Sequence, residues 1–284
     1  MGNTHSKELW SLFAYEIGAA CIFYTTLYAF MVHWLRTRIL DMSPKDCLSI
    51  TTNIGSTLHS LLMVAFSLSF FTERRWANPV VDEPRAAGHG ICIGTAYYLI
   101  DALLHVAFFA NYDAKTIPRR LDIIFHHLIS FLFPLFLVNC PDPYYGWAPL
   151  CMFMATEFST IFLNAQWFAK YFKMPKLHKW CKLAFVSAWF LVRLPAVVYC
   201  SWWLVAYWHE IIERMPRRVF ISIIAFVASG SLLQLTWTAL IVLKLIKALT
   251  ASANTNTLSA ISKTHAHGVS MEYTSEKPAC ADAK

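Results

Sequence analysis

The stretch LDIIFHHLISFLFPLFLV, residues 121–138, gives the clearest indication of how this chain folds. It is apolar over most of its length and approaches the roughly 20 residues that a helix needs to cross a bilayer. Two adjacent histidines, His126 and His127, interrupt it, and Asp122 precedes His126 by four residues on the same helical face. Ionisable side chains inside a membrane are costly and normally face a partner or a water-filled cavity. The stretch therefore predicts a transmembrane helix that contributes to an internal polar site.

The composition of the whole chain is that of a membrane protein. Hydrophobic residues make up 57% of the 284 residues and charged residues 14%, with a mean hydropathy of +0.45. Soluble domains usually carry about 25% charged residues. We therefore predict an all-α integral membrane protein with seven transmembrane helices, near residues 11–35, 50–71, 91–110, 121–139, 147–169, 183–208 and 219–247.

The domain organisation follows from these spans. Residues 1–44 hold an N-terminal segment with the first transmembrane helix, residues 45–249 hold the other six helices, and residues 250–284 form a polar tail. The tail is rich in Ser, Thr, Asn and Ala. We expect it to be disordered because it cannot bury enough apolar surface to fold.

Charge and cysteine usage limit the classes of partner. The net charge of +7 does not indicate nucleic-acid binding, because the basic residues lie in short loops beside apolar helices, where anionic headgroups explain their position. The eight cysteines include no CxxC pair, so we predict no metal site. We expect no bound cofactor, and the sequence does not define the oligomeric state.

The orientation in the membrane is read from the loops. The loops after the first, third and fifth spans, together with the tail, carry more than twice as many Lys and Arg residues as the opposite side. The positive-inside rule places that set, and with it the C-terminus, in the cytoplasm. However, Gly2 opens the pattern MGNTHSK, which matches a myristoylation site and needs a cytoplasmic N-terminus. Acylation would therefore require the opposite orientation or a different number of spans, and both interpretations stay open.

Polar side chains occur in every predicted span. In chain order they are Glu16, His59, Tyr97, Asp101, His105, His126, His127, Glu157, Asn164, Arg193 and Gln234. With a rise of about 1.5 Å per residue, several of them lie at a similar depth. This common layer predicts one cavity open to the cytoplasm.

Some of these residues also fit structural roles. Glu16 and Gln234 are of the type that holds membrane helices together by hydrogen bonds. Arg193 either pairs with Glu157 or Asp101 or contacts the headgroup of a ligand. The sequence leaves both roles of Arg193 open.

The histidine pair carries the stronger functional prediction. A neutral imidazole held by Asp122 or Asp101 can act as a general base or as a nucleophile. Neighbouring residues on a helix point about 100° apart. We therefore expect His126 and His127 to have different roles.

Four groups of residues on successive spans together resemble the TLC-domain family, which includes the ceramide synthases and the TRAM proteins. They are Ser56 and His59, Tyr97 and Asp101, Asp122 with His126 and His127, and Glu157 with Asn164. The resemblance covers residues 45–247. It implies a barrel-like bundle of six helices, spans 2–7, around a lipid cavity, in the endoplasmic reticulum or a related membrane.

The resemblance is closer to one part of that family than to another. In ceramide synthases the histidine pair continues into a Ser-Tyr…Asn stretch and a His-Asp…Asp stretch, and this sequence lacks both. It is more similar to the small TLC proteins linked to membrane lipid homeostasis. We assign catalytic roles to His126, His127 and Asp101. Substrate-binding roles are assigned to His59, Tyr97, Asp122, Glu157, Asn164 and Arg193.

Three functions compete. The first is lipid acyl transfer, with acyl-CoA as a co-substrate and membrane lipids as partners. The alternative is a non-enzymatic lipid-binding or regulatory protein, in which the same polar layer holds a headgroup. The third is a proton-coupled transporter, which would also use Asp, Glu and His side chains inside the membrane.

Overall fold

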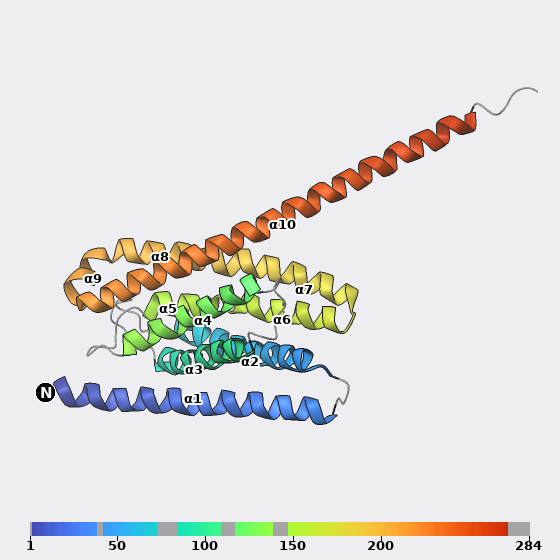
Figure 1. The fold of residues 1–284 in the computed structure, drawn as a ribbon. Helices are drawn as coiled ribbons and strands as arrows, with labels where there is room; N and C mark the ends of the chain where they lie inside the picture. Colours follow the sequence, from blue (N-terminus) through green and yellow to red (C-terminus); the bar gives the residue numbers. More distant parts are fainter. Residues whose placement is uncertain (1, 39–41, 73–84, 109–116, 139–146, 272–284) are drawn as a thin grey trace, which may run out of the picture. The chain divides into compact units, whose positions relative to one another are not determined.

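The computed structural model describes residues 2–38, 42–72, 85–108, 117–138 and 147–271, and the side chains of these except 2–11, 85–87, 117–120, 134–138, 214 and 252–271. Every regular element in these ranges is helical, as predicted (Figure 1). The helices are α1 (Gly2–Arg38), α2 (Pro44–Thr72), α3 (Arg85–Ala107), α4 (Ile117–Val138), α5 (Trp147–Ala155), α6 (Phe158–Tyr171), α7 (Pro175–Ala188), the π-helical segment η2 (Trp189–Arg193), α8 (Leu194–Ala206), α9 (Trp208–Arg214) and α10 (Arg217–Met271).

Several helices have the length and the apolar surface of membrane spans. Among the described residues, five stretches qualify: Leu12–Arg38, Pro44–Thr72, Gly88–Ala107, Pro175–Ala206 and Arg217–Ala251. The shorter stretch Leu121–Phe133 is also apolar. Large side chains on these helices are exposed, such as Ile22 at 70% and Leu191 at 75%, which suits contact with lipid. The number of seven spans stays a prediction.

The predicted span 147–169 is not one continuous helix. It consists of α5 and α6, which separate at Thr156 and Glu157. The backbone N–H groups of these two residues bond to carbonyls three residues earlier, at Phe153 and Met154, both at 3.1 Å. The Thr156 hydroxyl also donates to the Phe153 carbonyl at 2.6 Å, a local bond that competes with regular helical pairing. Glu157 therefore stands at an interruption between two short helices.

The predicted span 183–208 contains a second irregularity. Between α7 and α8 the chain widens into η2, which ends at Arg193. Pro195 follows and has no backbone N–H for the carbonyl four residues earlier. Single π-helical turns inside α-helices often occur at functional sites. A buried charged residue thus lies at each of the two interruptions.

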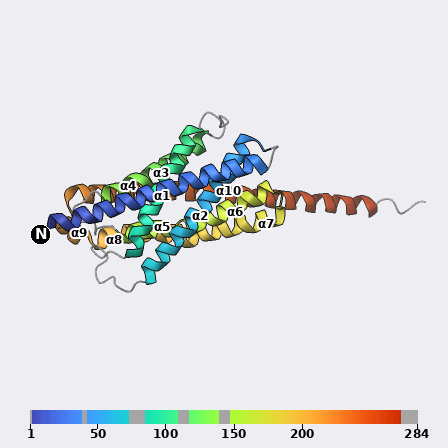
Figure 2. The ribbon, with the colours of Figure 1, turned by 90° about the horizontal axis from the view of Figure 1, so that it is seen from below.

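Residues 1–235 form one compact unit. In it α1 packs on α2 and α3, α3 packs on α4, and α2 also contacts α5 and α6. Figure 2 shows α1 crossing α2 and α3. An apolar core joins α2, α8 and α10 through Met63, Trp203 and Ile223, and the rings of Phe133 of α4 and Phe226 of α10 stack at 3.8 Å. A closed barrel of six helices stays a prediction.

Residues 236–284 form a second compact unit. In this unit α10 continues from Thr236 to Met271. The predicted polar tail begins inside this helix, at residue 250. The disorder of the tail and the domain limits 1–44, 45–249 and 250–284 stay predictions.

Candidate functional site

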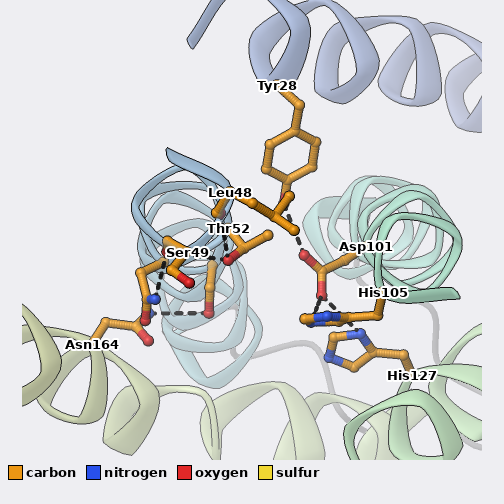
Figure 3. Close-up of polar contacts among 10 residues, drawn as sticks. Tyr28, Leu48, Ser49, Thr52, Asp101, His105, His127 and Asn164 are labelled. Carbon is orange, nitrogen blue, oxygen red and sulfur yellow. Dashed lines mark hydrogen bonds and ion pairs between the residues drawn. The ribbon is translucent and has the colours of Figure 1, made fainter. Parts of the chain in front are cut away.

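Asp101, on α3, is the centre of a polar cluster that joins three helices (Figure 3). It is only 2% exposed. Tyr28 of α1 donates its hydroxyl to Oδ1 of Asp101 at 3.1 Å. On the other oxygen, Oδ2, Nε2 of His105 lies at 3.3 Å and Nδ1 of His127, from α4, at 3.1 Å. The carboxylate therefore lies between one phenol and two imidazoles.

The contact between His127 and Asp101 has ion-pair distance without the alignment of a hydrogen bond. Nδ1 of His127 is buried and has no well-aligned hydrogen-bond partner among the described residues. The distance of 3.1 Å places the carboxylate beside the Nδ1 edge of the ring and so favours a proton there. The lone pair then lies on Nε2, at the opposite edge. An imidazole held in this way can act as a general base or as a nucleophile.

A glycine on α2 lets Tyr28 reach Asp101. A methyl group at Gly55 would lie 2.5 Å from the Tyr28 hydroxyl and from its ring carbon Cε1, far inside van der Waals contact. Tyr28 itself is 3% exposed and belongs to an apolar cluster with Tyr24 and Tyr97. The small residue on α2 therefore makes room for the side chain through which α1 contacts the site.

Aromatic rings connect Asp101 to its surroundings. The ring of His59 stacks on Tyr97 at 3.9 Å, nearly parallel, and Tyr97 meets His127 edge to face at 5.8 Å. His59 is 1% exposed, and neither of its nitrogens has a hydrogen-bond partner among the described residues. The structure thus brings together four of the predicted site residues: His59, Tyr97, Asp101 and His127.

Glu157, at the break between α5 and α6, forms a second cluster. It accepts hydrogen bonds from Ser60 at 3.2 Å and from Tyr98 at 3.3 Å. Glu157 and Tyr98 line a cavity of about 50 Å³, and His126 lines it as well. A cavity of this size holds a few water molecules and is too small for a lipid chain. His126 and His127 therefore face different surroundings, as their positions on a helix predict.

Arg193 forms a third cluster, in which its hydrogen bonds go to neutral side chains and its charge also attracts the buried carboxylate of Glu157. Its Nε donates to Ser159 at 2.7 Å, its Nη1 to the side-chain oxygen of Gln234 at 3.0 Å, and its Nη2 to Thr160 at 3.1 Å. The guanidinium also lies over the ring of Trp189, 4.4 Å from its centre. These contacts join η2, α6 and α10 within residues 1–235. They give Gln234 the role expected of it, as a link between helices.

The remaining predicted residues lie apart from Asp101. Asn164, on α6, donates to the hydroxyls of Ser56 and Thr57 on α2, at 3.0 and 3.1 Å. Asp122 is half-buried on α4, one turn before His126. Gly2 begins α1, and its acylation is not tested by the geometry. The substrate-binding roles of Asn164 and Asp122 stay predictions.

Sequence reasoning did not assign a role to Tyr28 or Tyr98, although each donates a hydrogen bond to a buried carboxylate. The signals were weak. Tyr98 follows Tyr97 directly, and Tyr28 lies on a helix that also carries Tyr15 and Tyr24. Aromatic residues are common in apolar spans, so the presence of a tyrosine there does not indicate a site. These two hydroxyls are identified only by their hydrogen bonds to Asp101 and Glu157.

Comparison with known families decides the affiliation. A family model described as the TLC domain matches residues 49–243, more than half of the chain. The chain belongs to the TLC-domain family. Together with the apolar helices, this makes it a multi-pass integral membrane protein. A search of the curated proteins finds no match. The matched segment of this TLC-domain protein does not include α1, although Tyr28 of α1 contacts Asp101.

Proposed function

We propose that this TLC-domain protein transfers an acyl group from acyl-CoA to a lipid acceptor and so contributes to membrane lipid homeostasis. The observation that carries the proposal is the pair formed by His127 and Asp101. The imidazole lies 3.1 Å from a carboxylate that is itself buried and held by Tyr28. Positioned acid–base groups of this kind accelerate reactions by about 10² to 10⁴-fold.

His127 is the proposed general base. Its Nε2 takes the proton from the hydroxyl or amine of the acceptor lipid while the acceptor attacks the thioester carbon of acyl-CoA. The tetrahedral intermediate then expels the CoA thiolate by cleavage of the C–S bond, and the imidazolium returns the proton to that thiolate. The products are the acylated lipid and free CoA. Asp101 stabilises the positive charge that His127 carries between the two proton transfers.

The other predicted site residues receive supporting roles. The cavity beside His126 and Glu157 is proposed to hold a second polar group of the acceptor, next to the group that reacts at His127. It combines a carboxylate, an imidazole and the Tyr98 hydroxyl, and the Tyr98 ring lies near both histidines. His59 has buried nitrogens without a hydrogen-bond partner among the described residues, so a polar atom of the substrate or a water molecule is proposed to bind there.

A lipid-binding protein without catalysis is the second candidate. Its support is that both oxygens of Asp101 are contacted by side chains of the chain itself, as in a structural lock between helices. In that case the polar clusters would hold a headgroup, and no product would form.

The test uses cells that lack the protein and are rescued at matched expression. We expect the wild type to restore a defined lipid class and His127→Gln to fail. His126→Gln is expected to retain part of the effect, because His126 lines the cavity and not the Asp101 cluster. His209→Gln, an exposed histidine on α9, is the control and should behave as wild type. Full rescue by His127→Gln would contradict the catalytic proposal and favour the lipid-binding one.

We also propose residence in the endoplasmic reticulum with a cytoplasmic C-terminus, as the loop charges suggest. Protease digestion of a C-terminal tag on intact microsomes tests the orientation, since a cytoplasmic tag is cleaved without detergent. Metabolic labelling with a myristate analogue, with Gly2→Ala as the control, tests acylation. Labelling of Gly2 together with a cytoplasmic tag would mean an even number of membrane crossings.

A further inference from the structure

A second and larger cavity lies outside the cluster of Asp101, in a groove between α1, α2 and α3. Its volume is about 500 Å³, in the range of roughly 300–1,000 Å³ typical of ligand sites. One face of α1 forms its long wall. The residues of that face are Thr25, Tyr28, Ala29, Val32, His33 and Arg36.

The length of the groove corresponds to one membrane leaflet. From Thr25 to Arg36 a helix rises by about 16 Å, at about 1.5 Å per residue. The hydrocarbon core of a bilayer is about 30 Å thick, so the groove covers about half of it. Arg36 lies in the last turn of α1, and Leu48 of the opposite wall lies near the start of α2. Both mark the same end of the groove.

The chemistry of the walls changes along this length. Val32, Leu48 and Leu104 give the groove apolar sides. At the end of α1 the walls become cationic or polar, with the exposed side chains of Arg36 and His33. An apolar slot with a positive end is complementary to an acyl chain that carries an anionic headgroup.

We propose that this groove binds one anionic phospholipid from the leaflet at the C-terminal end of α1. An acyl chain lies along α1, and the phosphate lies at Arg36 and His33. The groove is distinct from the small cavity beside His126, and the proposal does not rest on acyl transfer.

Tyr28 connects the groove with the Asp101 cluster. Its side chain forms part of the groove wall while its hydroxyl donates to Asp101. A lipid in the groove therefore packs against the residue that holds the carboxylate. The first helix, which the family match does not include, supplies both this wall and the cationic end.

The test places the full-length protein in nanodiscs that contain a trace of phospholipid with a photoreactive acyl chain. The headgroup of this probe is either phosphatidylserine or phosphatidylcholine, and crosslinked peptides are identified by mass spectrometry. We expect labelling of α1 and α3 near Ala29 and Leu104, stronger for the serine headgroup. Equal labelling by the two headgroups, or labelling confined to other helices, would overturn the proposal.

Two pairs of variants make the test specific. Ala29→Trp fills the groove and should abolish the labelling, whereas Ala19→Trp, at an exposed position of α1 that does not line the groove, should not. Arg36→Gln should lower the labelling by phosphatidylserine about fivefold, as expected for the loss of one basic residue near an anionic lipid. Arg38→Gln, an exposed arginine outside the groove, is its control. If Arg36→Gln and Arg38→Gln have equal effects, the headgroup does not bind at Arg36.

Discussion

Asp101 and Arg193 are both charged and buried inside the helical unit, at 2% and 5% exposure, but their partners differ. Arg193 donates to a serine, a threonine and a glutamine, none of which can exchange a proton with it near neutral pH. Asp101 lies beside two histidines, which can. The comparison shows that burial of a charge does not by itself indicate a reactive site. The partner groups decide whether the charge stabilises a fold or supports proton transfer.

The same comparison distinguishes predicted residues whose contacts suit proton transfer from those whose contacts suit a link between helices. For Asp101 and His127 the short distance supports the proposed proton transfer. For Arg193 the geometry favours a link between η2, α6 and α10, and contact with a substrate stays a prediction.

The largest effect is expected for Asp101→Asn. The amide keeps the shape but removes the charge that stabilises the protonated His127, so acyl transfer should fall by about 10² to 10⁴-fold. The helices should stay folded, because Tyr28 can still donate to the amide oxygen. Activity is measured in membranes with isotope-labelled acyl-CoA, and folding by size-exclusion chromatography in detergent. A variant that is fully active would remove Asp101 from the mechanism.

Arg193→Met should act on stability. It removes three hydrogen bonds from a charged donor, among them the bond to the buried side-chain oxygen of Gln234. We expect the free energy of unfolding to fall by about 3 kcal/mol. Hydrogen bonds to charged groups contribute about 1.5–3 kcal/mol each, and other interactions partly compensate for their loss. Thermal unfolding in detergent should show a lower Tm than for Arg218→Met, an exposed arginine on α10. An unchanged Tm together with lost activity would mean that Arg193 binds substrate.

Gly55→Ala tests the path from α1 to the site. Its methyl group would collide with Tyr28, so the tyrosine must move away from Asp101. We expect activity to fall about tenfold, which corresponds to an activation free energy raised by about 1.4 kcal/mol. Gly18→Ala is the matched control, because a methyl group there meets no neighbouring atom.

Tyr28→Phe provides a second measurement of the same contact. It should reduce activity to the same extent as Gly55→Ala, and the double variant should be no worse than either single one. If the activity loss of the double variant equals the product of the two single losses, Gly55 does not act through Tyr28.

The smallest effect is expected for Asn164→Ala. Asn164 donates to Ser56 and Thr57, and hydrogen bonds between membrane helices contribute about 0.6 kcal/mol on average. Thermal unfolding should show a loss of about 1 kcal/mol, with activity per folded molecule unchanged. A selective loss of activity would instead support the predicted contact between Asn164 and substrate.

Much of the fold could be predicted because the membrane restricts the choices. Apolar runs with few charges have one common outcome, a helix, and the described residues confirm it. The breaks inside the spans 147–169 and 183–208 were not predicted. A threonine such as Thr156 or a proline such as Pro195 is tolerated in a continuous membrane helix as well, so neither residue alone indicates an interruption.

The site could be predicted in part. An aspartate and a histidine in neighbouring apolar spans have few alternatives to meeting one another, and Asp101 indeed lies beside His127. Asp122 competed with Asp101 because sequence spacing shows only that it shares a helical face with His126. The contribution of Tyr28 depends on the close approach of α1 to Gly55, and sequence spacing contains no information about packing between helices that are distant in the chain.

The most direct test of the central claim, that Asp101 acts through His127, is a double-mutant comparison. Labelled acyl-CoA is supplied to membranes that contain equal amounts of wild type, Asp101→Asn, His127→Gln or the double variant, and labelled lipid is quantified by mass spectrometry. We predict that the double variant is no slower than His127→Gln alone, because the effects of residues that act as one unit are strongly non-additive. If the loss of rate in the double variant equals the product of the losses in the two single variants, Asp101 does not act through His127. Normal labelling with His127→Gln would also contradict the claim.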